Sequence, residues 1–459
     1  MKSFAALLGS LLLLSLLGVA AYGQNAGTGA IAGVVTDASG AVVAEARVKV
    51  TNNLTGETRT AMSAGHGNYT VPLLPPGTYT VEASGAGFKN TSYRAVTVSV
   101  TEILTLNIQL QVGSVQESVE VTGAGEQLQT ETSALGRVTD EKMVESMPLV
   151  TRNYTQIIGL SSGVSADVTN AGELGRGNGS NGADAFAAAG GSNNDNNFQM
   201  NGVEINDFQQ SGNFSGGVAV PNPDTIQEFK VQTGQYDASY GRDAGANVNV
   251  VTKSGGNQFH GSAFEFFRND ALNANEWFRN RNGEPRQLLR QNQYGMTFGG
   301  PIIKNKLLFF TSYQGTRQQN GVDPTCSTTF SSPPLTNDRS AAALGALFYG
   351  QPTFIQEILG PGVGPSVAQD GSNIDGPALA LMQMKLPNGQ YLYPTPQRID
   401  TSLPFVEQGS YSASIPCPFY EEQFMTNADW NQSDKSQWQV RFFFANSSQQ
   451  NRATSPAAV

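Results

Sequence analysis

The sequence has few charged residues, two cysteines and two histidines. Charged side chains make up 14% of its 459 residues, and the formal net charge is −10 at pH 7. An acidic balance without any block of Lys or Arg argues against a nucleic-acid partner. His66 and His260 stand far apart in the sequence, so a histidine-based zinc site is not expected. No nucleophile–base pair or ligand spacing is recognisable, so we expect no enzyme, no catalytic residue, no metal and no cofactor.

Long apolar runs are absent except at the start of the chain. Lys2 is followed by an apolar run over residues 4–21 and by the small-x-small triplet 21–23. This pattern predicts a signal peptide over residues 1–23, cleaved before Gln24. The alternative is an uncleaved anchor, since the run almost reaches the length that spans a bilayer. We therefore expect an exported chain that can enter a membrane only through strands.

Glycine is plentiful, with 51 residues, and this favours short strands and turns. Residues 29–113 contain about seven short β-prone segments separated by turn signals, which predicts a β-sandwich. Residues 33–37, 67–69, 74–81 and 87–88 resemble the carboxypeptidase regulatory-like domain, a prealbumin-like module of the carbohydrate-binding-like fold class. In that family the module is non-catalytic. The resemblance implies a periplasmic spacer or docking module, and sugar binding would rest on fold analogy alone.

A polar, β-prone segment follows the sandwich. It consists of Glu117, Ser118, Val119, Glu120, Val121 and Thr122. An extended segment of this kind can add as a strand to the edge of a partner's sheet. The residues alone leave open whether it is a docking strand, a linker or the first strand of the next domain.

Residues 114–254 carry the most specific motifs. A short helix is predicted over residues 138–143, a second apolar helix follows Arg152, and Asn201-Gly202 predicts a tight hairpin. Residues 226–233 alternate as a strand. The stretch 240–255, which ends in VTKSG, closely resembles the end of the plug domain of TonB-dependent receptors. In those receptors a segment placed like residues 117–122 is the TonB box, which implies the energy-transducing protein TonB as a periplasmic partner.

The remaining residues, 256–459, contain aromatic-rich alternating segments. We identify four strands, at residues 258–269, 292–299, 307–317 and 437–444, with Phe264, Phe298, Phe309 and Phe442 expected to face lipid. Their connections are long, short and long, as in a transmembrane barrel with long outer loops and short inner turns. The alternative is a soluble antiparallel sheet. Because four strands cannot close a barrel, we expect an incomplete chain, either a short gene product or a truncated one.

Both cysteines, Cys326 and Cys417, lie in the long third connection. Two cysteines in an exported loop predict one disulfide, and two free thiols are the alternative.

These features together predict a mostly β protein. Its parts are an N-terminal β-sandwich (29–113), an α+β plug domain with a TonB-box-like linker (114–254) and the first strands of a transmembrane antiparallel β-barrel (256–459). The order resembles the Oar-like branch of TonB-dependent receptors. The resemblance implies energised uptake of a bulky nutrient, such as an oligosaccharide or a peptide, across the outer membrane, with membrane lipid and TonB as partners. A surface-exposed adhesion or structural protein is the alternative, and the sequence does not identify the ligand.

Overall fold

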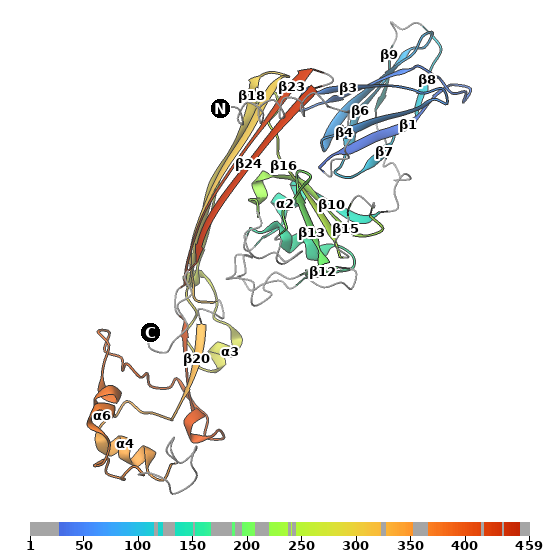
Figure 1. The fold of residues 1–459 in the computed structure, drawn as a ribbon. Helices are drawn as coiled ribbons and strands as arrows, with labels where there is room; N and C mark the ends of the chain where they lie inside the picture. Colours follow the sequence, from blue (N-terminus) through green and yellow to red (C-terminus); the bar gives the residue numbers. More distant parts are fainter. Residues whose placement is uncertain are drawn as a thin grey trace, which may run out of the picture.

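The computed structural model describes residues 27–113, 118–122, 134–149, 152–166, 186–188, 195–206, 220–236, 240, 245–322, 327–351, 366–414, 417–433 and 436–449. It shows a sandwich, a plug and a sheet of long strands (Figure 1). A further segment, residues 321–416, which we call the excursion, lies beyond the end of those strands that is farther from the sandwich. No helix among the described residues is long and apolar enough to cross a membrane. The predicted signal peptide, residues 1–23, lies outside the described residues.

The sandwich consists of two sheets that share one apolar core. The first contains β4 (Asn68–Leu74), β1 (Gly29–Asp37), β7 (Ile103–Thr105) and β8 (Ile108–Leu110). The second has the order β3 (Thr58–Met62), β2 (Arg47–Asn52), β5 (Gly77–Ser84), β6 (Asn90–Val98) and β9 (Ser118–Thr122). Alternate residues such as Val48, Val50, Tyr79 and Val81 are fully buried between the sheets. The predicted β-sandwich is confirmed.

The plug is a five-stranded mixed sheet with short helices. Its strand order is β10 (Leu135–Asp140), β15 (Ile226–Gly234), β16 (Asn247–Thr252), β13 (Asn197–Met200) and β14 (Val203–Glu204). The helices α2 (Glu141–Ser146) and η1 (Tyr154–Leu160) contribute Val144, Tyr154 and Ile158 to its core. A small separate hairpin pairs β11 (Val164–Ala166) with β12 (Phe186–Ala188).

The predicted hairpin turn of the plug is confirmed, and its predicted first helix begins later than expected. Asn201 and Gly202 have φ of 52° and 80° and form the hairpin between β13 and β14. The helix predicted at residues 138–143 begins only at Glu141, because residues 138–140 belong to β10. Asp140 ends the strand and caps the helix, since its carboxylate accepts a hydrogen bond from the Met143 N–H.

The third unit is an antiparallel sheet of long strands, which we call the wall. Its order is β17 (His260–Asn269), β18 (Leu289–Ile303), β19 (Leu307–Asn320), β23 (Cys417–Ser433) and β24 (Ser436–Gln449). One face carries buried, mostly polar side chains, among them Gln291, Gln293, Gln314, Gln318, Gln423 and Asn427. The opposite face exposes apolar side chains, among them Met296, Phe298, Phe424, Trp438, Val440 and Phe442. This is the alternation of a barrel wall, polar inside and apolar outside.

Two expectations about this sheet were wrong. It has five described strands rather than four, because β23 lies inside the segment taken as one long loop. Phe264 was expected to face lipid, but it pairs across from Gly295 on the inner face, as Phe266 does across from Gln293. Phe298, Phe309 and Phe442 do lie on the outer face, as the strand register shows.

The connections differ in length at the two ends of the sheet. The tight turns β18–β19 and β23–β24 lie at the end nearer the sandwich, and the long connections lie at the opposite end (Figure 1). The first long connection contains η4 (Asp270–Leu272) and α3 (Trp277–Arg281). The second, between β19 and β23, is the excursion. It holds α4 (Ala341–Phe348), α6 (Gly376–Gln383), η5 (Phe405–Glu407) and a small sheet of β20 (Ser327–Ser332), β22 (Gly409–Ser414) and β21 (Arg398–Ile399).

Candidate functional site

The plug contacts the inner face of the long sheet through polar side chains of β23. Asn427 donates its amide hydrogens to the Thr252 hydroxyl (3.0 Å) and to the Lys253 carbonyl (2.7 Å). On the same strand, nearer the excursion, Gln423 donates to the carbonyl of Val220 (3.0 Å). Among the described residues, these plug–wall contacts are directional hydrogen bonds, and the plug's apolar core contains no residue of the wall.

The motif that ends the plug, residues 251–255, also contacts the rest of the plug and the strand β19. Lys253 forms ion pairs with Glu141 (2.7 Å) and Glu145 (2.9 Å) of α2. Thr252 bonds to Asn201, whose side-chain oxygen accepts the Thr252 N–H at 3.0 Å. A Cβ on Gly255 would overlap the backbone oxygen of Phe309 in β19. Only glycine allows the chain to pass this close to the wall, which explains the residue at this crossing.

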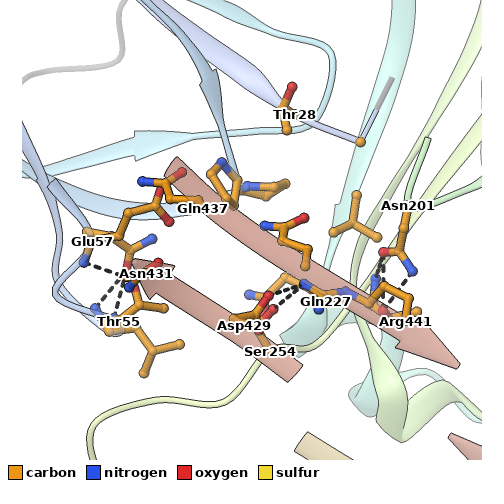
Figure 2. Close-up of a pocket in the computed structure, with 18 of the residues that line it drawn as sticks. Thr28, Thr55, Glu57, Asn201, Gln227, Ser254, Asp429, Asn431, Gln437 and Arg441 are labelled. Atoms are coloured by element: carbon orange, nitrogen blue, oxygen red, sulfur yellow. Dashed lines mark hydrogen bonds and ion pairs between the residues drawn. The ribbon is translucent and has the colours of Figure 1, made fainter. Parts of the chain in front are cut away.

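Sandwich, plug and wall meet around a small cavity of about 60 Å³ (Figure 2). Arg441 of β24 forms an ion pair with Asp429 of β23 (2.6 Å) and donates to the Ser254 hydroxyl of the plug (3.1 Å). Glu57 lines the same cavity from the sandwich, and its burial raises the pKa of its carboxyl. The cavity is small and is lined by residues of all three units, so we interpret it as a joint between them.

Arg152, which precedes the predicted apolar helix, joins the plug to the first wall strand. Its backbone is in the left-handed region, with φ of 54°. Its guanidinium forms an ion pair with Asp224 and lies over the rings of Phe264 (4.6 Å) and Phe266 (4.0 Å). A buried cation needs such partners to offset its lost hydration, so Arg152 is placed as an anchor.

The sandwich and the plug share a second contact, centred on Glu228 of β15. Its carboxylate accepts a hydrogen bond from the buried backbone N–H of Val100. Burial raises the pKa of Glu228 to about 7. On the same strand, Lys230 lies with its Nζ 3.5 Å from the Thr101 carbonyl oxygen, and burial lowers its pKa. Sequence reasoning missed both residues, because they fit an ordinary alternating strand.

The candidate TonB box is partly described. Ser118, Val119, Glu120, Val121 and Thr122 form β9, while Glu117 lies outside the described residues. β9 pairs in parallel with β6, from Asn90 opposite Ser118 to Arg94 opposite Thr122, and it is the last strand of its sheet. The segment is therefore neither an isolated linker nor part of the plug sheet. Its assignment as the TonB box stays a prediction.

The predicted disulfide is also only partly described. Cys417 is the first residue of β23 and is buried. Cys326 directly precedes β20 and lies outside the described residues, so the pairing stays a prediction. Within the described ranges, no group of three or more His, Cys, Asp or Glu residues is arranged to hold a metal ion.

Three family models match successive parts of the chain. They are the Carboxypeptidase regulatory-like domain (residues 30–111), the TonB-dependent Receptor Plug Domain (127–248) and the Outer membrane beta barrel domain (251–459). A curated relative, the TonB-dependent transporter Oar of Myxococcus xanthus, is 29% identical over 328 residues. That match covers 67% of this chain and 29% of the relative, so the chain spans less than a third of the relative's length.

Two solved structures match the chain at low sequence identity and low TM-score. The outer membrane transporter YddB of Escherichia coli has a TM-score of 0.40 at 10% identity, covering 68% of this chain and 33% of that one. The siderophore receptor PirA of Acinetobacter baumannii has a TM-score of 0.32 at 13% identity, covering 68% and 40%. The family models and the curated relative carry the assignment. Together they support a TonB-dependent receptor of the cell outer membrane with an N-terminal carboxypeptidase regulatory-like domain.

Proposed function

We propose that the receptor takes up a bulky nutrient across the outer membrane with energy supplied through TonB. The observation that carries this proposal is the plug seated on the inner face of the wall by polar contacts, chiefly those of Asn427. We also propose the domain limits 29–113, 114–254 and 256–459, with residues 1–23 removed on export.

The chemistry of the plug–wall contact favours a plug that can move. The side-chain oxygens of Gln423 and Asn427, the two wall residues of this contact, are buried and have no hydrogen-bond partner among the described residues. A buried polar atom without a partner costs free energy. Opening such a contact costs less free energy than separating a packed apolar core. This suits a plug that must move to let a nutrient pass.

We propose β9 as the strand on which TonB acts. β9 uses one edge to pair with β6, and its other edge has no partner strand within the described sheet. A strand with an open edge presents backbone donors and acceptors that a partner's strand can use. The sandwich then holds the docking strand extended in advance, which reduces the entropy lost on binding.

The proposal is tested by a pull-down of the full-length receptor with the periplasmic part of TonB. Val119→Pro removes a backbone donor and should weaken binding at least about tenfold, whereas Val119→Ala should leave it within about twofold. Equal binding by the two variants would place the docking strand elsewhere. A second function, surface adhesion, is favoured by the folded excursion. In that case loss of TonB binding would leave the protein's activity unchanged.

A further inference from the structure

The excursion between β19 and β23 encloses a cavity of about 190 Å³, far from the plug and the sandwich. Its walls come from β20, from β22 and from the hairpin in which Lys385 and Tyr391 form a β-bridge. Aromatic and apolar side chains line most of it: Phe330, Leu386, Tyr391, Tyr393, Pro394 and Tyr411. Several aromatic faces around one small space suit a flat apolar ring.

A second, more polar recess of about 370 Å³ adjoins the first. The two share the lining residues Gln390, Tyr391, Pro394 and Tyr411, so they are direct neighbours. The second recess adds Asn337, Thr395 and the cation Lys385. The combined site is thus apolar on one side and polar on the other, with a positive charge at the polar side.

A second cation lies directly behind these walls. The Lys385 Nζ lies 4.8 Å from the centroid of the Tyr391 ring, and the guanidinium carbon of Arg339 lies 4.9 Å from the same centroid. Arg339 is 2% exposed. Its Nη2 donates to the Tyr393 carbonyl (3.3 Å) and to the Thr395 hydroxyl (3.2 Å), residues that line the two recesses.

The charge of Arg339 is not neutralised within the described part of the chain. Its Nε and Nη1 atoms are buried and have no hydrogen-bond partner there. No described carboxylate forms an ion pair with it: Asp338, its neighbour, is exposed and bonds to the backbone N–H of Ser340. A buried guanidinium without a counter-ion is unfavourable, and an anion nearby would lower its free energy.

We propose that this cavity binds a small organic anion that carries a flat apolar ring. The ring lies among Phe330, Tyr391 and Tyr411, and the anionic group lies toward Lys385 in the field of Arg339. In uptake, this anion with its ring would be one end of the bulky nutrient, and that statement rests on the proposed uptake function. The binding itself does not, because the site lies within the excursion and contains no residue of the plug.

The test uses the full-length receptor in outer-membrane vesicles and two fluorinated probes of the same shape, 4-fluorobenzoate and the neutral 4-fluorobenzamide. Fluorine NMR line broadening, corrected with vesicles that lack the receptor, gives the affinity of each. We expect the anion to bind about tenfold more tightly, the equivalent of one charge-assisted contact. Equal affinity for anion and amide would overturn the proposal.

Variants separate the two halves of the site. Lys385→Gln should abolish the preference for the anion while leaving the amide unchanged. Tyr411→Ala should weaken both probes, and Tyr411→Phe should bind both as the parent does, which guards against a variant that merely fails to fold. Lys304→Gln, at the exposed turn on the opposite end of the sheet, is the matched control. If Lys385→Gln kept the preference, the charge assignment would be wrong. If the receptor bound TonB normally in the pull-down but did not bind the probes, the anion-binding proposal would be wrong and the uptake proposal would stand.

Discussion

The guanidinium carbon of Arg152 lies 4.0 Å from the centre of the Phe266 ring. One residue belongs to the plug and the other to the inner face of the first wall strand. The contact explains why an aromatic sits on a face that is otherwise mostly polar: Phe264 and Phe266 receive the Arg152 side chain.

Removing Arg152 should loosen the plug. Arg152→Ala leaves Asp224 without its partner, and we expect the free energy of plug unfolding to fall by about 3 kcal/mol. A double-mutant cycle with Phe266→Leu, followed by urea unfolding of the receptor, should give a coupling of about 1 kcal/mol. Phe267→Leu, on the opposite face of the same strand, should show no coupling. Equal coupling for both phenylalanines would refute the anchor role.

The contact between sandwich and plug should depend on pH through Glu228. Its pKa is raised by burial from 4.5 to about 7, so between these values the folded protein holds a proton that the unfolded chain has released. Its contribution to stability is therefore full below pH 4.5, falls as the pH rises to about 7 and is constant above that. The loss across this window should be about 3 kcal/mol.

Thermal unfolding of the receptor at pH 5 and pH 8 tests this dependence. Glu228→Gln keeps an oxygen for the Val100 N–H but cannot titrate, so it should remove most of the difference between the two pH values. Glu102, Asp140 and Lys230 are the other charged groups that act on Glu228. If Glu228→Gln retained the full difference, the assignment of this pH dependence to Glu228 would be wrong.

Charges placed on the two faces of β24 should have different costs. Phe442 lies on the outer face and is 52% exposed, and Phe442→Lys should destabilise the membrane-inserted protein by about 2–4 kcal/mol if this depth is near the bilayer centre. Gln439 lies on the inner face, so Gln439→Lys should cost much less. Unfolding from lipid vesicles measures both. Similar small costs would indicate a sheet that faces water on both sides.

The two cysteines should be joined. Mass spectrometry of the unreduced receptor should find one linked peptide that contains Cys326 and Cys417. On the chain-entropy model a loop of this length adds about 4 kcal/mol of stability. Free alkylation of both thiols without reduction would disprove the pairing.

The sequence predicted most of the fold, because sandwich, plug and wall each have short-range patterns. β24 shows this clearly: Trp438, Val440 and Phe442 alternate with Gln437, Gln439 and Arg441, and the strand was predicted from that alternation. The Asn201-Gly202 turn was predicted because it depends only on two adjacent residues.

β23 was missed because its alternation is broken on both faces. Phe419 and Met425 are apolar but face inward, and Glu422 is charged but faces outward. Its partner is on another strand: Glu422 pairs with Arg317 of β19 and accepts the Tyr313 hydroxyl. Such cross-strand pairing cannot be recognised before the register is known.

The joints between units were unpredictable for the same reason. Arg441, Asp429 and Ser254 come from three places in the chain, and nothing in the local sequence of any one indicates the others. Glu228 and Val100 are likewise separated by 128 positions. β-strand patterns report which face is buried, but not what covers it.

The central claim is an outer-membrane receptor, which places the excursion outside the cell and the sandwich in the periplasm, and surface labelling tests it most directly. In a background with Cys326→Ser and Cys417→Ser, a single cysteine replaces either the exposed Ser372 of the excursion or the exposed Ala38 of the sandwich. With a membrane-impermeant maleimide, Ser372→Cys should be labelled on intact cells. Ala38→Cys should be labelled only after the outer membrane is permeabilised. Labelling of Ala38→Cys on intact cells, or of neither variant until the cytoplasm is released, would contradict the account.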